Sequence, residues 1–466
     1  MGGLNRNLVL AIVAAAVGSG FQHGYHTGVI NVPQAILKEW IESVWGDRLG
    51  SVSESKINVL WGVMTSIMNV GGTIGGVLSG LVSTKFGPKS ALLYNNVLVF
   101  IASVLMGFAK LANLYEMMIL GRLIIGVNCG FNAGLCPMYL TEISPVDLRG
   151  ALGSVYQLLI VISILISQIV GLEMMLGNKH WDILFLLPIA FGIFQVITLF
   201  FCTESPKYLL SVKQNNERAE NSLKFLRKSE DVNEEFSQLK HEDEANKAMP
   251  KVTLKQMFRE RSLRIPLMIA MLVMVAQQFS GINAVIFYST ETFISGGLSE
   301  QNAQYATIGI GLVNLIMTVI SMMLVDIAGR KTLLLVGFGG MAIDTLLLSM
   351  ALHFSKSHPA IPWVCIVLIG IYIILFAAGA GSIPWFLVTE IFNQEARPTA
   401  VSLAVPTNWI ANFIVTLTFP SIAGAIGPYV FLIFVVLNVI FFIFILKMVP
   451  ETKNKTVEEI VSQWKD

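Results

Sequence analysis

The sequence predicts an all-α membrane protein with about twelve membrane-spanning helices in two pseudo-symmetric six-helix bundles. Three observations predict this class. The 466 residues are 54% hydrophobic and only 13% charged, with a mean hydropathy of +0.69, whereas soluble domains carry about 25% charged residues. Apolar runs of roughly 20 residues, long enough to cross about 30 Å of hydrocarbon as helices, recur along the whole chain. A charged motif of the first half also returns in the second half.

That motif is TEISPVDLR at 141–149, which returns as TEIFNQEAR at 389–397. Its Glu and its Arg both recur after 248 positions (390 − 142 and 397 − 149). Glu204 and Glu451, in TESPK and PETK, differ by nearly the same interval, 451 − 204 = 247. Repeats of this length in apolar sequence are typical of transporters built from two homologous bundles around a central site.

The twelve predicted spans divide six and six. They lie near 8–30, 57–82, 91–109, 114–138, 151–172 and 182–202, and near 265–289, 304–325, 332–353, 361–388, 400–424 and 427–447. We therefore expect an N-terminal bundle at 1–202, a cytoplasmic linker of short amphipathic helices at 203–264, a C-terminal bundle at 265–448 and a cytoplasmic tail at 449–466.

The basic residues orient the predicted spans. If both termini lie inside, 24 of the 31 Lys and Arg fall in inside segments, as the positive-inside rule requires. The charges thus predict a multi-pass membrane protein with both termini cytoplasmic. We expect it in the plasma membrane.

Other classes of function lack their usual signals. The four Cys lie in apolar runs without paired spacing, which argues against a disulfide framework or a zinc site and predicts small buried side chains. The chain has no G-x-x-x-x-G-K-[ST] phosphate loop, organised nucleophile or acid pair. We expect no enzyme activity, cofactor, metal or nucleic-acid partner; the sequence names no protein partner.

Charged residues at the cytoplasmic ends of spans predict a gate. Glu142, Arg149, Glu390 and Arg397 are costly at this depth unless paired, so we expect them to pair across the two bundles when that face is closed. The alternative is that each pair ties a loop to its own bundle.

Further members of this gate are expected in the turns nearby. Glu204 and Glu451 precede or follow the helix-breaking Pro206 and Pro450. The KFGPK and DIAGRK turns add Asp326 and Arg330, among other charges. Basic residues there also fit ordinary membrane anchoring.

Neutral amides inside the spans predict a site for a polyol such as a sugar. They are Gln157, Gln277, Gln278, Asn283, Asn314, Asn408 and Asn412. Gln278 and Asn283 face one cavity if the helix unwinds at Gly281. Unpaired amides in lipid cost several kcal/mol, so the set needs either partners or a wet cavity. Simple interhelical bonding is the alternative for any one of them.

Two further segments add to this site. In GAGSIPWF, Gly379, Gly381 and Pro384 predict an interrupted helix, and Trp385 offers a ring to stack on a sugar face. His26 in the first span is either a carrier of a coupling proton or a neutral hydrogen-bonding residue.

Together these segments closely resemble the animal facilitative glucose transporters, in the sugar-porter branch of the major facilitator superfamily. The resemblance covers residues 8–460. Its landmarks are GYHTGVINVPQ, GRLIIGVNCG, PMYLTEISPVDLRG, TESPKYLL, QQFSGINA, SIPWFLVTEIF, NWIANF and VPETKNKT.

The resemblance implies a twelve-helix carrier for D-glucose and similar hexoses. It implies sugar contacts at Gln157, Gln277, Gln278, Asn283, Asn314, Trp385 and Asn408, and an outer gate at Thr27, Phe287 and Tyr288. Two departures touch the inner gate: Pro88 replaces a basic residue and Ala377 a glutamate, so we expect a weaker cytoplasmic closure. The function expected is a passive hexose uniporter; a proton–sugar symporter using His26 and a sugar sensor with little transport are the rivals.

Overall fold

The computed structural model describes residues 4–145, 148–248, 252–355, 357–453, 455, 459 and 460, without the side chains of 149–151, 153, 154 and 326. No strand occurs in these residues. The first half of the chain forms α1 (Arg6–Gly28), α2 (Gln34–Leu49), α3 (Glu54–Phe86), α4 (Pro88–Ala112), α5 (Tyr115–Ile143), α6 (Arg149–Val170), α7 (Trp181–Leu186) and α8 (Pro188–Phe200).

The remaining helices are α9 (Pro206–Ser211), α10 (Asn216–Arg227), α11 (Asn233–Ala248), α12 (Leu254–Arg259), α13 (Arg261–Phe279), α14 (Ile282–Ser295), α15 (Glu300–Ala328), α16 (Arg330–His353), α17 (Ile361–Phe376), the π-helix η2 (Ala377–Gly381), α18 (Ile383–Glu390), α19 (Arg397–Ile426), the 3₁₀ turn η3 (Gly427–Tyr429) and α20 (Val430–Met448).

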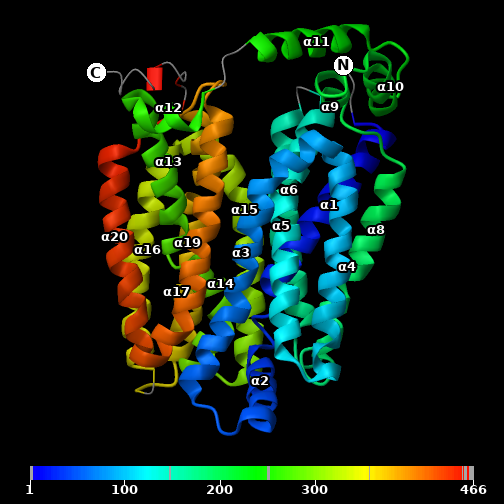
Figure 1. Cartoon of the computed structure of the whole chain (residues 1–466). Helices are drawn as coiled ribbons and strands as arrows, with labels where there is room; N and C mark the ends of the chain where they lie inside the picture. The colour runs from blue at the N-terminus through cyan, green and yellow to red at the C-terminus, as the bar shows by residue number, and fades with distance from the viewer. Residues whose placement is uncertain are drawn as a thin grey trace. The chain divides into compact units, whose positions relative to one another are not determined.

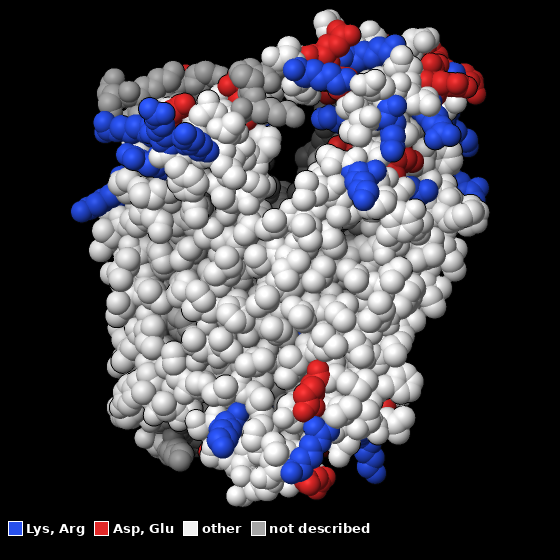
Figure 2. All heavy atoms as spheres, in the orientation of Figure 1, with Lys and Arg blue, Asp and Glu red and all other residues white. Residues whose placement is uncertain are grey.

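The helices account for all twelve predicted spans. Ten continuous helical segments of the described chain are long and apolar enough to cross a membrane. The segment Arg397–Met448 has 52 residues and divides at η3 into α19 and α20, and α6 adds the shorter apolar stretch Val155–Val170. On the face in Figure 2, charged side chains lie near the helix ends and the surface between them is uncharged, as a hydrocarbon layer requires.

By its internal contacts the chain forms two compact units that do not follow the midpoint of the sequence. Unit 1 comprises 1–27, 70–167 and 180–250, and unit 2 comprises 28–69, 168–179 and 251–466. The expected boundaries at 202 and 264 come from the repeat and stay predictions. The finding that matters for function is that residues 28–69 of the first half pack in unit 2.

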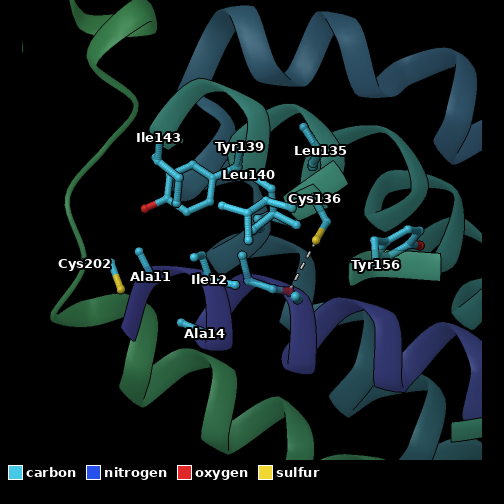
Figure 3. Close-up of a cluster of buried hydrophobic side chains, with 14 of the residues drawn as sticks. Ala11, Ile12, Ala14, Leu135, Cys136, Tyr139, Leu140, Ile143, Tyr156 and Cys202 are labelled. Atoms are coloured by element: carbon cyan, nitrogen blue, oxygen red, sulfur yellow. Dashed lines mark hydrogen bonds between the residues drawn. The ribbon is translucent and has the colours of Figure 1, made fainter. Parts of the chain in front are cut away.

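Unit 1 has its core where α1, α5 and α6 meet. Figure 3 shows Ala11 and Ile12 of α1 facing Leu135, Cys136 and other side chains of α5. The Cys136 thiol donates to a backbone carbonyl of α1, at 3.5 Å. All four Cys residues of the chain are buried thiols, as predicted.

The predicted linker forms short helices, as expected. In Figure 1, α9, α10 and α11 gather at the same end of unit 1 as the N-terminus, while α12 belongs to unit 2. The three helices of unit 1 enclose their own small core of Leu210, Leu223, Val232 and Phe236.

Candidate functional site

A break between α13 and α14 organises the polar interior of unit 2. Gly281 has φ +105°, a left-handed conformation in which other residues are strained. The ring of Phe434 lies 3.0 Å from where a β-carbon on Gly281 would stand. The predicted unwinding at this glycine is therefore present. It places Asn283 beside Gln278, which lies in the last turn of α13.

Four of the predicted sugar-binding amides meet at this break and hydrogen-bond to one another. Gln278 Nε2 donates to Gln277 Oε1 at 3.1 Å and to Asn408 Oδ1 at 2.9 Å. Asn408 Nδ2 donates to Gln277 Oε1 at 2.8 Å, and Asn283 Nδ2 donates to Gln278 Oε1. All four side chains are buried. We call Gln277, Gln278, Asn283 and Asn408 the amide network.

The interrupted helix predicted at 379–384 is also present and contacts this network. The π-helix η2 frees backbone carbonyls, and Gln277 Nε2 donates to those of Ala380 (2.8 Å) and Gly381 (2.6 Å). The chain resumes as α18, whose third residue, Trp385, has 38% of its surface exposed. The side chain that satisfies the broken helix is thus one of the predicted sugar ligands.

Two predicted ligands are not part of the amide network. Asn314 is half-buried on α15, and no hydrogen bond joins its side chain to the network within the described residues. Gln157 lies on α6 of unit 1, where it is exposed. Their assignment as sugar contacts continues to rest on the resemblance.

Two of the three residues predicted for the outer gate, Phe287 and Tyr288, lie on α14, which is hydrogen-bonded to the segment 28–69. Asn31 Nδ2 donates to the Ile286 carbonyl (2.6 Å) and to Ser289 Oγ (2.9 Å). The Tyr288 hydroxyl lies 2.8 Å from Thr65 Oγ1 and donates to the Thr416 carbonyl at 2.9 Å. We call these contacts of 28–69 with α14 the clasp.

The clasp extends to the end of α14. Glu291 accepts from Lys38 Nζ at 2.8 Å and from the Gln34 amide. Phe287 is buried next to Tyr288. Thr27 belongs to unit 1, and its hydroxyl donates to the His23 carbonyl at 2.9 Å. The structure thus places Phe287 and Tyr288, but not Thr27, within the unit that contains the clasp.

The charged repeats make contacts within each unit. In unit 2, Arg330 forms a bidentate pair with Glu390, with N–O distances of 2.8 to 3.2 Å. In unit 1, Glu142 accepts from the Ser205 hydroxyl. The Arg397 guanidinium donates to the Phe392 carbonyl at 3.1 Å. Each of these contacts joins residues of the same unit.

Two charged residues of the predicted gate fall outside the described side chains: Arg149, which begins α6, and Asp326 near the end of α15. Pairing across the bundles in a closed state stays a prediction.

The repeated glutamates Glu204 and Glu451 each bind the start of a helix. Glu204 accepts from the backbone N–H groups of Lys89 (2.8 Å) and Ser90 (3.0 Å) at the start of α4. Glu451 accepts from those of Arg330 (2.9 Å) and Lys331 (3.0 Å) at the start of α16. A carboxylate at a helix N-terminus satisfies free N–H groups and favours the helix dipole.

Backbone hydrogen bonds also set the charge state of Glu451. Burial alone would raise the pKa of its carboxyl, but N–H groups of Lys453, Arg330, Lys331 and Thr452 outweigh it and lower the pKa from its ordinary value.

His26 is fully buried on α1 in unit 1. Its ring nitrogens make no hydrogen bond within the described chain, and its carbonyl accepts from Arg122 at 2.6 Å. Both His26 and Arg122 are thus buried and joined through the His26 backbone, and the two roles predicted for His26 both stay predictions.

Sequence analysis missed one ionisable residue of unit 2. Asp344 on α16 is buried, and its Oδ2 has no hydrogen-bond partner in the described residues. The signal was available, since Asp344 is the single charged residue in the apolar run 332–352.

Comparison with known proteins places the chain among transporters. Residues 11–464 match the family model described as sugar (and other) transporter. The chain is 44% identical over 456 residues to solute carrier family 2, facilitated glucose transporter member 3, of Mus musculus, covering 97% of this chain and 92% of that protein. The protein of the same name from Rattus norvegicus is 43% identical, with the same coverage.

Solved structures agree. A partially occluded inward-open conformation of the xylose transporter XylE from E. coli has a TM-score of 0.81 and 28% identity, covering 97% of this chain and all of that one. The major facilitator superfamily proton:xylose symporter XylE bound to 6-bromo-6-deoxy-D-glucose has a TM-score of 0.77 and 28% identity, covering 98% and 99% of the two chains.

Proposed function

Because this chain belongs to the sugar (and other) transporter family, we propose that it is a facilitative hexose transporter, with D-glucose as substrate, working by alternating access. The single observation that carries this proposal is the 44% identity to a facilitated glucose transporter across nearly the whole of both chains. The all-helical fold of the major facilitator superfamily and the neutral amides at two helix breaks support it.

The amide network supplies the chemistry for binding a sugar. Amides both donate and accept, as hydroxyl groups do, so sugar hydroxyls replace the bonds among Gln277, Gln278, Asn283 and Asn408 without leaving a charge. Because these groups are buried, a ligand that lacks a matching hydroxyl leaves one of them unpaired, which is the physical basis of selectivity. Trp385 is exposed beside the break at η2 and offers its ring face. We assign Gln157 and Asn314 to the same sugar on the resemblance.

We assign the clasp to the outer gate. Its bonds hold residues 28–69 against α14, and we infer that they close that end of the carrier. The similarity to inward-open and partially occluded XylE structures supports this assignment. The inner gate is assigned to Glu142, Arg149, Glu204, Asp326, Arg330, Glu390, Arg397 and Glu451. The protein is a multi-pass membrane protein; we propose the plasma membrane, with both termini cytoplasmic.

Transport in proteoliposomes tests this function. Purified protein is expected to give saturable D-glucose uptake without a sodium or proton gradient, reduced by competing hexoses and unchanged by a protonophore. Absence of saturable uptake in vesicles that contain folded protein would refute the proposal.

A proton-coupled symporter is the second candidate, since His26 is buried with its backbone carbonyl bound by Arg122 and a structural relative is a proton:xylose symporter. That activity would accumulate sugar against its gradient and alkalinise the medium. Equilibration without accumulation would exclude it.

A further inference from the structure

Asp344 is a carboxyl group in the interior of unit 2 that the proposed transport mechanism does not use. It lies on α16, a predicted membrane span, with 3% of its surface exposed. Within the described residues it has no ion pair, and its Oδ2 accepts no hydrogen bond. An unpaired carboxylate at this depth costs several kcal/mol or more. Such residues are rare in membrane spans, and they commonly mark proton or ion sites.

A second unsatisfied oxygen lies on the adjoining helix. Asn438 of α20 donates its amide to the Ser280 carbonyl at 3.2 Å, while its Oδ1 is buried with no partner in the described chain. The helices α16 and α20 pack together. Two buried acceptors thus lie on facing helices, each lacking a hydrogen.

The register of the two helices places these acceptors within about one helical turn of each other. Phe338 packs against Phe441, with ring centroids 6.1 Å apart, and Ser349 Oγ donates to the Pro428 carbonyl at 3.0 Å. In two antiparallel helices, opposite residues have numbers with a nearly constant sum, here 779 and 777 for the two pairs. Residue 434 therefore lies opposite Asp344. Asn438 is four residues further along the same buried face, about one helical turn away.

The group around Asn438 joins this region to the break in α13. The Ser280 carbonyl accepts from both Asn438 and the Tyr372 hydroxyl (3.1 Å). Ser280 Oγ donates to the Gln277 carbonyl at 2.7 Å. A short chain of hydrogen bonds therefore runs from Asn438 through Ser280 to the backbone of Gln277, a member of the amide network.

The other ionisable groups of α16, which are Arg330, Lys331 and His353, are at the helix ends. The elements packed against α16 carry the following ionisable residues: Glu300, Tyr305 and Asp326 of α15, Cys365 and Tyr372 of α17, Glu390 of α18, Tyr429 of η3 and Lys447 of α20.

We propose that Asp344 is a proton-binding site: its neutral carboxyl donates to Asn438 and stabilises the state with the clasp closed. One proton satisfies both orphaned oxygens. Loss of that proton leaves an uncompensated charge buried in the interior of unit 2, which disfavours this state. Sugar exchange therefore depends on pH through Asp344. The transport measurement that tests this inference rests on the proposed function, whereas the proton site itself does not.

The first test measures D-glucose exchange in proteoliposomes with equal pH on both sides, between about pH 5.5 and pH 8.5. Wild type is expected to lose activity as pH rises, by at most tenfold per pH unit for a single proton. Asp344→Asn keeps a neutral group of the same shape and is expected to give a flat profile at the low-pH level. Asn438→Leu removes the acceptor and is expected to move the midpoint to lower pH.

His26→Gln is the matched control, because it removes the other buried titratable candidate. It is expected to keep the wild-type dependence on pH. A flat profile for His26→Gln, or a wild-type profile for Asp344→Asn, would overturn the proposal.

The second test does not depend on transport or on a variant that folds. Dicyclohexylcarbodiimide adds to protonated carboxyls in apolar surroundings, so peptide mass spectrometry of the wild-type protein is expected to show Asp344 modified, and less so as pH rises. Absence of modification at every pH in folded protein would overturn the proton site. Failure of glucose exchange together with modification of Asp344 would instead refute the transport function and leave the site standing.

Discussion

The carboxylate of Glu451 lies 2.7 Å from the point where a β-carbon on Gly329 would stand. The repeat reproduces this relationship, since Glu204 lies 2.6 Å from the corresponding point on Gly87. Both glycines have positive φ, +88° and +91°, and each precedes the helix whose N-terminus the glutamate binds. The glycine thus permits both the turn and the close approach of the carboxylate.

Gly329→Ala is expected to lower stability by about 1 to 3 kcal/mol, because it adds strain at a left-handed residue and displaces Glu451. Thermal unfolding in detergent measures the effect. Gly80→Ala is the control, since a β-carbon there meets no atom within 4 Å and Gly80 lies within α3. It should leave stability unchanged or raise it. Equal effects of the two substitutions would contradict the account of the turn.

Glu451→Gln is expected to change the dependence of stability on pH. The folded pKa of Glu451 is lowered, so its stabilising contribution is present above its unfolded value of 4.5 and is lost as pH falls through the folded pKa. The unfolding temperatures of variant and wild type should therefore differ at neutral pH and converge in acid.

Glu39→Gln, at an exposed residue of α2, is the control and should follow wild type at every pH. A difference between Glu451→Gln and wild type that persisted in acid would show that the effect is steric rather than electrostatic.

Gln278→Leu is expected to abolish saturable D-glucose transport, because it removes the amide that joins Gln277, Asn283 and Asn408. Gln195→Leu is a matched control, since Gln195 is a fully buried amide of unit 1 that donates to Ser19 at 2.8 Å. It should lower stability while leaving KM unchanged. Equal loss of transport in the two variants would indicate that the network only binds helices together.

Asn31→Ala is expected to open the clasp. It removes three hydrogen bonds to α14, of which the one donated by the Thr290 N–H is long at 3.4 Å. Because the two shorter bonds contribute about 1 kcal/mol each, the affinity for an inhibitor that binds from the outer face should rise by about five- to thirty-fold. Inhibitor binding to oriented vesicles measures this ratio against an inhibitor of the inner face. If both affinities change together, the clasp is not a gate.

Much of the fold follows from local sequence. The spans are apolar runs, and the breaks at Gly281 and 379–381 occur where glycine and proline interrupt them. The meeting of Gln277, Gln278 and Asn283 was predictable for the same reason. The packing of 28–69 against α14 was not predictable, because its hydrogen bonds join residues more than 200 positions apart, as between Asn31 and Ile286.

The charges were harder to place than the amides. Several basic residues along the chain are candidate partners for Glu390, and the sequence alone does not select Arg330, with which it pairs. Asp344 shows another limit: its helix, α16, packs against α20, which carries Asn438 and is distant in sequence. Polar residues on packed helices therefore appear in the sequence as isolated residues.

The hydrogen bonds within the amide network matter for the step in which the carrier returns without bound sugar. A passive carrier must return unloaded before it can take another molecule, and bare polar groups in a dry interior would obstruct that return. With each amide supplied by another, and on the proposed function, we expect the vacant protein to reorient with these groups still hydrogen-bonded and the sugar hydroxyls to replace these internal partners on binding.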